Sequence, residues 1–258
     1  MSDVYITAAA GLVASFLSGL LGIGGGVVLT PALLYGPGLL GAPILPVKII
    51  TGLSVVQAIS ASVIGALRHH RYGNVSLRIV RLMAPTSALA SFAGALASGA
   101  MPDRLLIGVF AAFALLGAVT LTLPERGPAQ PVDDLHVNVP LAVGIAAGLG
   151  FFGGMVGIGA VSFIIAALVY LLRIPVRTAI GTSLGIGLFA AVAALVGKAA
   201  TAQLDLPLAA VVLVGAVLAS PAGAWVSVRT HPGLLVRLLA LVIALAGVRM
   251  AWQALTGM

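Results

Sequence analysis

Two short glycine-rich segments are the residues of this sequence best suited to bind a small anion. They are Gly22-Ile23-Gly24-Gly25-Gly26 and Gly157-Ile158-Gly159. Each lies between apolar stretches, so it is predicted to end one helix and begin the next. A helix that starts at such a break has unpaired N–H groups and the positive end of its dipole there. Glycine also lets a ligand approach the backbone without a Cβ in the way.

The alternative interpretation is that these glycines only permit close helix packing, as small residues commonly do within membranes. The presence of a break in both halves of the chain favours a binding site, because paired discontinuous helices are typical of sites for small anions and ions. A dinucleotide site is excluded, because no strand precedes either segment and no acidic residue follows about 20 residues later.

Hydroxyl and amide side chains that could assist anion binding lie just inside two helices that are predicted to follow prolines 46 and 175. They are Thr51, Ser54, Gln57, Thr182 and Ser183. The alternative for each hydroxyl is a hydrogen bond to the backbone of its own helix, which is common in apolar helices. Together with the glycine segments, these residues form the predicted substrate-binding set.

The sequence offers little for catalysis or metal binding. It has no cysteine, and no carboxylate lies inside a predicted span. Enzymes within membranes need a nucleophile with its base, or a set of metal ligands, at depth. Adjacent His69 and His70 have no further histidine or carboxylate near them in the sequence. We therefore predict no catalytic residue, no metal site and no cofactor, and expect that the protein is not an enzyme.

The composition identifies the class of protein that carries these residues. Of 258 residues, 61% are hydrophobic and 7% are charged, with a mean hydropathy of +1.21. Soluble domains carry about 25% charged residues, and disordered chains have far fewer apolar ones. The net charge of +7 comes from basic residues that stand between apolar runs. These indicate membrane topology and contacts with lipid headgroups rather than binding to nucleic acid.

The apolar intervals predict an all-α, multi-pass membrane protein with ten helical elements, four of them short. The expected elements span residues 4–21, 27–40, 49–67, 82–101, 105–123, 139–153, 160–172, 178–197, 206–228 and 232–255. Helices over 139–153 and 160–172 would be only about 22 and about 20 Å long, less than the ~30 Å hydrocarbon core. The glycine-broken pairs are therefore predicted to form re-entrant hairpins with the glycine-rich tip at depth, and the alternative is that each of their helices crosses the membrane.

An internal repeat relates the two halves of the chain. The segment from Pro46 to Ser54 matches that from Pro175 to Ser183, with a basic residue and a glycine at the same offsets. The glycine segments match as well, and fixed-order similarity of this kind marks duplication. We therefore predict one membrane repeat over 1–123, a polar linker over 124–138 and a second repeat over 139–258.

The basic residues predict that the two repeats are inverted. An odd number of elements in each half reverses the orientation of the second half. With that arrangement the cytoplasmic side holds nine of the 13 basic residues: Arg68, Arg71, Arg78, Arg81, Arg126, Arg173, Arg177, Arg229 and Arg237. The outer side holds Lys48, Arg104, Lys198 and Arg249. A parallel arrangement divides them almost evenly, which the positive-inside rule disfavours.

The segment from Gly22 to Leu33, its partial copy at Gly157-Ile158-Gly159 and the stretch Gly181-Thr182-Ser183-Leu184 resemble the sulfite exporter TauE/SafE family. The resemblance extends over essentially the whole chain. It implies a transporter of the bacterial cytoplasmic (inner) membrane that moves small sulfur-containing anions or organic sulfonates, usually outward. The second copy has Ala160 and Val161 in place of glycines, so the two breaks need not contact substrate equally.

Two classes of function remain from the sequence. The first is a secondary transporter, in which one half rocks against the other around the glycine breaks. Its expected partners are a small anion and membrane lipids, with no nucleic acid. The second is a passive anion channel or a membrane subunit of a larger complex. The identity of the anion, the coupling ion and the oligomeric state are left open by the sequence.

Overall fold

The computed structural model describes residues 2–21, 26–39, 44–122, 137–158, 161–227 and 232–256. Within these ranges the chain forms ten α-helices and no β-strand. The helices are α1 (Ser2–Leu21), α2 (Gly26–Leu39), α3 (Val47–Arg71), α4 (Leu77–Ala100), α5 (Asp103–Thr122), α6 (Val139–Val156), α7 (Val161–Tyr170), α8 (Val176–Ala200), α9 (Leu206–Ser227) and α10 (Pro232–Thr256). The prediction of an all-helical chain with ten elements is confirmed.

Several helices are long and apolar enough to cross a membrane. In the described part of the chain five meet this requirement: α3, α4, α6, α8 and residues 206–223 of α9. A shorter apolar helix covers residues 8–17 of α1. Large apolar side chains such as Leu89, Leu218 and Trp225 are exposed on the outer faces of these helices, as expected for surfaces that contact lipid. The protein is therefore a multi-pass membrane protein.

The helix boundaries follow local signals in the sequence. Pro46 and Pro175 precede α3 and α8 with nearly identical φ and ψ, −55° and 136° against −54° and 137°. Proline cannot donate a backbone hydrogen bond, which makes it well suited to the position before or at a helix start. Asn138 caps α6 by accepting from the N–H of Leu141 at 3.1 Å.

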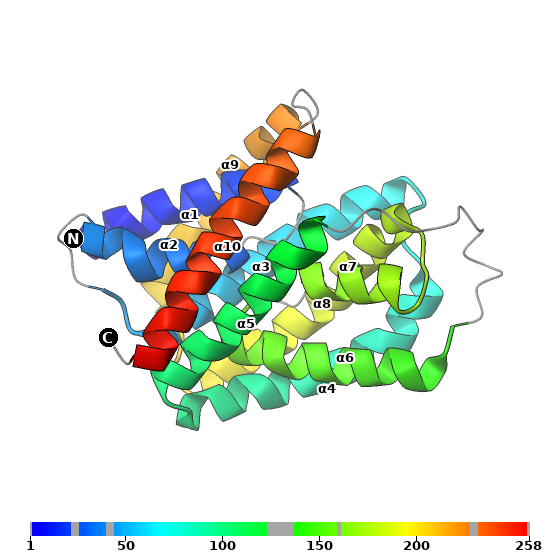
Figure 1. Cartoon of the computed structure of the whole chain (residues 1–258), viewed down its shortest axis with the longest axis horizontal. Helices are drawn as coiled ribbons and strands as arrows, with labels where there is room; N and C mark the ends of the chain where they lie inside the picture. The colour runs from blue at the N-terminus through cyan, green and yellow to red at the C-terminus, as the bar shows by residue number, and fades with distance from the viewer. Residues whose placement is uncertain are drawn as a thin grey trace.

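The helices pack in matched pairs (Figure 1). The long helices α3 and α8 contact each other in the interior. The other extensive pairs are α1 with α9, α4 with α6, α4 with α8, and α5 with α10. If α1–α5 and α6–α10 are taken as equivalent sets, the pair α1–α9 corresponds to α6–α4. The pairs α3–α8 and α5–α10 are each their own counterpart. The pair α4–α8 is the exception, because its counterpart α3–α9 is a much less extensive contact.

Small residues allow two of these pairs to approach closely. In the α4–α6 pair, a Cβ on Gly94 would overlap the carbonyl oxygen of Phe151. In the α1–α9 pair, a Cβ on Gly223 would overlap the carbonyl oxygen of Phe16. Such backbone contact is the usual role of glycine between membrane helices.

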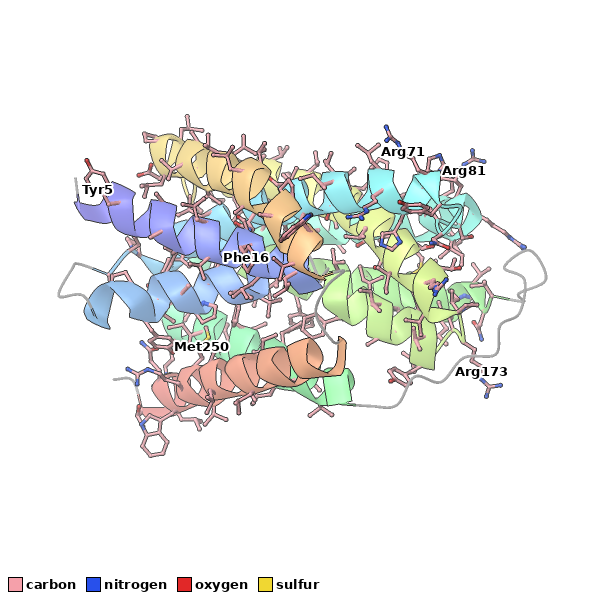
Figure 2. The ribbon with its side chains drawn as sticks, turned by 90° about the horizontal axis from the view of Figure 1, so that it is seen from above. Tyr5, Phe16, Arg71, Arg81, Arg173 and Met250 are labelled. Carbon is pink, nitrogen blue, oxygen red and sulfur yellow. The ribbon has the colours of Figure 1, made fainter. Side chains whose placement is uncertain are left out.

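The two halves of the chain start at opposite ends of the molecule. In Figure 1, α1 starts near the labelled N-terminus, at the left, whereas α6 starts at the right and runs the other way. In Figure 2, Arg71, Arg81 and Arg173 all lie in the half of the molecule away from Tyr5, with Arg173 on the other side of the bundle from the first two. These three arginines belong to the group that is predicted to be cytoplasmic. Most of the linker predicted over 124–138 lies outside the described residues.

Candidate functional site

The second glycine break begins where α6 ends. Gly157 adopts the left-handed conformation, with φ of 78°. The N–H groups of Gly157 and Ile158 both donate to the carbonyl oxygen of Gly153, at 2.9 and 3.2 Å. These two amides therefore close the end of α6 and are already paired. The donors left for a ligand are the first-turn amides of α7, which begins at Val161. Gly159 lies outside the described residues.

The first glycine break leads into α2, which begins at the buried Gly26. Its preceding residues, Gly22, Ile23, Gly24 and Gly25, lie outside the described part of the chain. Gly26 packs directly against the second break. A Cβ on Gly26 would lie 3.2 Å from the Cα of Ile158 and 3.3 Å from the carbonyl oxygen of Gly157. The start of α2 and the end of α6 therefore meet in the interior.

Helix α3 lines this junction with two of the predicted residues. Thr51 presents its carbonyl oxygen to Gly157, where a Cβ would overlap it. The carbonyl oxygen of Ser54 lies 3.4 Å from the position that a Cβ on Gly26 would take. The Ser54 hydroxyl donates to the carbonyl oxygen of Ile50 at 3.0 Å and lies 2.7 Å from the Thr30 hydroxyl of α2. Ser54 thus bonds both to its own helix and across to α2.

Gln57 lies further along α3 and is buried. Its Nε2 donates to the Ser15 hydroxyl on α1 at 2.9 Å. Its Oε1 is buried and has no hydrogen-bond partner among the described residues. Buried polar atoms are generally paired, so this oxygen is a candidate acceptor for a donor that the protein alone does not supply.

The two predicted residues on α8 lie elsewhere. Thr182 accepts a hydrogen bond from the N–H of Ser76, in the loop between α3 and α4, at 3.0 Å. The Ser183 hydroxyl donates to the carbonyl oxygen of Ile180 at 2.8 Å, within its own helix. Both side chains are buried. The structure thus brings Gly26, Gly157, Ile158, Thr51 and Ser54 together. It places Thr182 beside the α3–α4 loop and leaves the Ser183 hydroxyl bonded within α8.

A lysine that was not predicted to belong to the site lies beside the second break. We expected Lys198 to be one of the basic residues outside the membrane, but its side chain is completely buried, with 0% exposed. Four oxygens lie within hydrogen-bonding distance of its Nζ: Thr51 Oγ1 at 2.9 Å, Ser98 Oγ at 2.8 Å, the carbonyl of Met155 at 2.9 Å and Gln203 Oε1 at 2.9 Å. The sequence did not predict this burial, which arises because the α8–α9 turn folds Gln203 over the end of α8.

Gln203 holds this polar cluster together from the turn between α8 and α9. Its Nε2 donates to Thr201 Oγ1 at 2.6 Å and to the carbonyl oxygen of Ala95 at 3.3 Å. Its backbone carbonyl packs against Gly52, where a Cβ would overlap it. The turn is therefore fixed to the start of α3 and to the end of α4, next to the second break.

The described residues of the junction are closed to solvent. Gly26, Gly157 and Ile158 are buried, as are Thr51 and Ser54. Apolar side chains surround them, among them Val27, Leu53 and Val156. A ligand can therefore reach these residues only if the surrounding helices separate.

Comparison with known proteins adds a family and several relatives. The model of the family described as "Sulfite exporter TauE/SafE" matches residues 7–250. A "Probable membrane transporter protein" of Haemophilus influenzae is 30% identical over 67% of this chain and 65% of its own length. A protein of the same name from Xylella fastidiosa (strain 9a5c) is 30% identical over 98% of this chain and 97% of its own. The "Probable membrane transporter protein YunE" of Bacillus subtilis is 22% identical over 94% and 95%. No solved structure matches the chain.

Proposed function

Because the chain belongs to the sulfite exporter TauE/SafE family, we propose that it is a secondary transporter of small sulfur-containing oxyanions or organic sulfonates. We place it in the cytoplasmic membrane, with export as the direction of transport. The anion is held where the two glycine breaks meet, by first-turn amides of α2 and α7.

The observation that carries this proposal is the contact of Gly26 with Gly157 and Ile158. It joins a helix start from the first half of the chain to a helix end from the second half, inside a bundle of apolar helices. Irregular backbone at membrane depth is tolerated only where protein or a water-filled cavity surrounds it. Helix breaks from two halves that converge in this way are typical of secondary transporters.

The matched helix pairs support inverted repeats as the basis of movement. The pair α1–α9 has its counterpart in α4–α6, and α3–α8 is its own counterpart. Two bundles of similar construction can rock about a shared interior, which exposes a central site to each side in turn. The buried junction then corresponds to a closed stage of this cycle.

Hydroxyl groups supplement the amides at the junction. Thr51 and Ser54 lie against the breaks through their backbone carbonyls. Their hydroxyls donate to the carbonyl oxygens of Lys48 and Ile50 in this closed stage, and we assign them to the oxyanion once the helices part. Gln57 lies further along α3, and its Nε2 would donate to the anion in exchange for its bond to Ser15. Thr182 and Ser183 occupy on α8 the position that corresponds to the start of α3 in the first half of the chain. We assign them to a second point of the pathway, which the anion passes on the other side of the bundle.

Reconstitution into liposomes tests the function. Purified protein should catalyse saturable uptake of sulfite or small sulfonates, and internal unlabelled substrate should accelerate the uptake of labelled substrate. A passive channel would give flux without saturation or counterflow. A membrane subunit of a larger complex would give no flux on its own. Small carboxylates, included in the same panel, define how selective the site is for sulfur oxyanions.

A pair of substitutions on α2 tests the location of the site. Gly26→Ala places a methyl group 3.2–3.4 Å from the second break and from Ser54, so the neighbouring backbone must move. Gly36→Ala is a matched control on the same helix, because a Cβ there meets no atom within 4 Å. We expect Gly26→Ala to lower the uptake rate about tenfold, and Gly36→Ala to retain it. Equal uptake by both variants would contradict the placement of the anion site at the start of α2.

A further inference from the structure

Lys198 is the one charged side chain that is buried in the described part of the chain. Its four hydrogen-bond partners are two hydroxyls, an amide oxygen and a backbone carbonyl, none of which carries a formal charge. Removing an ammonium group from water costs several kcal/mol, so a buried cation without a counter-ion is expensive. Residues of this kind inside membranes are usually functional.

The ammonium group has more acceptors than it can use. Lysine carries three N–H donors, whereas four oxygens lie within 2.8–2.9 Å of Nζ. One acceptor can therefore be replaced by another without leaving a lysine N–H unpaired. An anionic oxygen would be a stronger acceptor than any of the four neutral ones.

The position of the ammonium group links it to the second break. Met155 belongs to the last turn of α6, and its carbonyl oxygen accepts from Lys198. Thr51 contacts Lys198 through its hydroxyl and Gly157 through its carbonyl oxygen. The ammonium group thus contacts Thr51, a residue of the junction, and Met155, two residues before Gly157.

We propose that Lys198 supplies the positive charge of the anion site, by exchanging one of its oxygen partners for an oxygen of the substrate when the helices separate. This inference rests on the function proposed above, and it narrows the substrate class. One buried cation compensates a singly charged sulfonate. A doubly charged oxyanion of the same shape would leave a buried charge uncompensated, which is strongly unfavourable.

A purely structural role for Lys198 predicts a different behaviour. A cation near the carboxyl end of a helix stabilises the carbonyl groups there, and α6 ends beside Lys198. In that case the lysine contributes to folding but has no effect on which anion binds. Anion selectivity therefore distinguishes the two roles.

The first experiment uses the wild-type protein in detergent and calorimetric binding. Methanesulfonate and sulfate have nearly the same tetrahedral shape, but at mildly acidic pH, where the lysine keeps its proton, only sulfate carries two negative charges. We expect methanesulfonate to bind at least about tenfold more tightly at that pH. Equal or tighter binding of the doubly charged anion would overturn the proposal, and so would the absence of methanesulfonate binding.

The second experiment compares two lysines. Lys198→Met keeps the length of the side chain and removes its charge, and should weaken methanesulfonate binding at least about tenfold. Lys48→Met is the matched control, because Lys48 is only partly buried and donates to the carbonyl oxygen of Gly99 rather than to the break. It should change binding less than about threefold. Unchanged binding in Lys198→Met, or equal losses in both variants, would overturn the proposal.

Liposome flux separates this inference from the proposed function. Methanesulfonate transport that persists in Lys198→Met at wild-type rate and affinity contradicts the role of Lys198 and leaves the transporter intact. Selective binding without flux contradicts the transporter and supports the Lys198 site. If Lys198→Met fails to fold, as judged by gel filtration, the wild-type comparison of the two anions still decides the proposal.

Discussion

The two ends of the α3–α8 pair have the same backbone contacts but different side chains. At one end Gly52 packs against the carbonyl oxygen of Gln203, and at the other Gly181 packs against that of Asn74. In the register that aligns Gly52 with Gly181, Gln203 corresponds to Asn74. Gly52 of α3 thus packs against the turn that follows α8, and Gly181 of α8 packs against the turn that follows α3.

The polar residues at these ends are not equivalent. Lys198 is fully buried, with four acceptor oxygens within hydrogen-bonding distance of its Nζ. In the same register its counterpart is His69, which is half-buried and has an Nδ1 without a partner in the described ranges. The backbone thus follows the repeat, while the chemistry differs between its two copies. We infer that the scaffold is shared and that the end with Lys198 determines how the anion is recognised.

The largest effects should come from the shared backbone contacts. Gly52→Ala and Gly181→Ala each force a methyl group into a carbonyl oxygen. We expect each to lower the free energy of unfolding by about 3 kcal/mol, the upper part of the range for overpacked sites. Thermal unfolding in detergent measures this. Gly148→Ala is the control, because a Cβ there meets nothing within 4 Å. A large loss of unfolding free energy in only one of the two variants would show that the backbone packing at the two ends is not equivalent.

Substitution of the two turn residues, Gln203 and Asn74, should lower the free energy of unfolding by smaller and unequal amounts. Gln203→Ala removes an acceptor of Lys198 and leaves buried groups on Ser98 and Lys198 with fewer partners. We expect a loss of about 2 kcal/mol in the free energy of unfolding. Asn74→Ala should cost less than about 1 kcal/mol, since Asn74 is only partly buried. Similar losses in the two variants would argue against a special role for the Lys198 end.

The repeat-related serines should give the smallest difference. Ser54 lies within hydrogen-bonding distance of Thr30 on α2, whereas the Ser183 hydroxyl donates within its own helix. Hydrogen bonds between membrane helices average about 0.6 kcal/mol. Ser54→Ala should therefore lower the free energy of unfolding by about that amount more than Ser183→Ala, and only Ser54→Ala should slow sulfonate uptake, about threefold. Greater slowing in Ser183→Ala would shift the site toward α8.

The number of helices could be predicted because glycines, prolines and charges interrupt the apolar runs. The predicted ends of the helices agree less well with the structure. The charge-free interval 49–67 predicts a shorter helix than α3, which continues through Arg68 to Arg71 because charged residues can extend a helix beyond the lipid. Likewise α6 reaches Val156 instead of ending at 153, since Gly153 and Gly154 remain helical until Gly157 turns left-handed.

The candidate site could be predicted only in part. The sequence indicates which glycines interrupt helices, but contact between Gly26 and Ile158 depends on how the two halves pack. Thr182 and Ser183 match the pattern of Thr51 and Ser54 yet contact other elements. Lys198 stands at the end of an apolar run, where lysine usually reaches the membrane surface. Its burial depends on the α8–α9 turn, and no local pattern in the sequence indicates that turn.

Alternating access to the junction of the two breaks is the central claim, and cysteine labelling tests it directly. The chain has no cysteine, so Ile158→Cys introduces a single thiol at a buried position, 3% exposed. In vesicles of either orientation, a membrane-impermeant thiol reagent should label this residue slowly from both sides, and a transported sulfonate should protect it. Labelling from one side only, without protection by any sulfonate, would contradict the account.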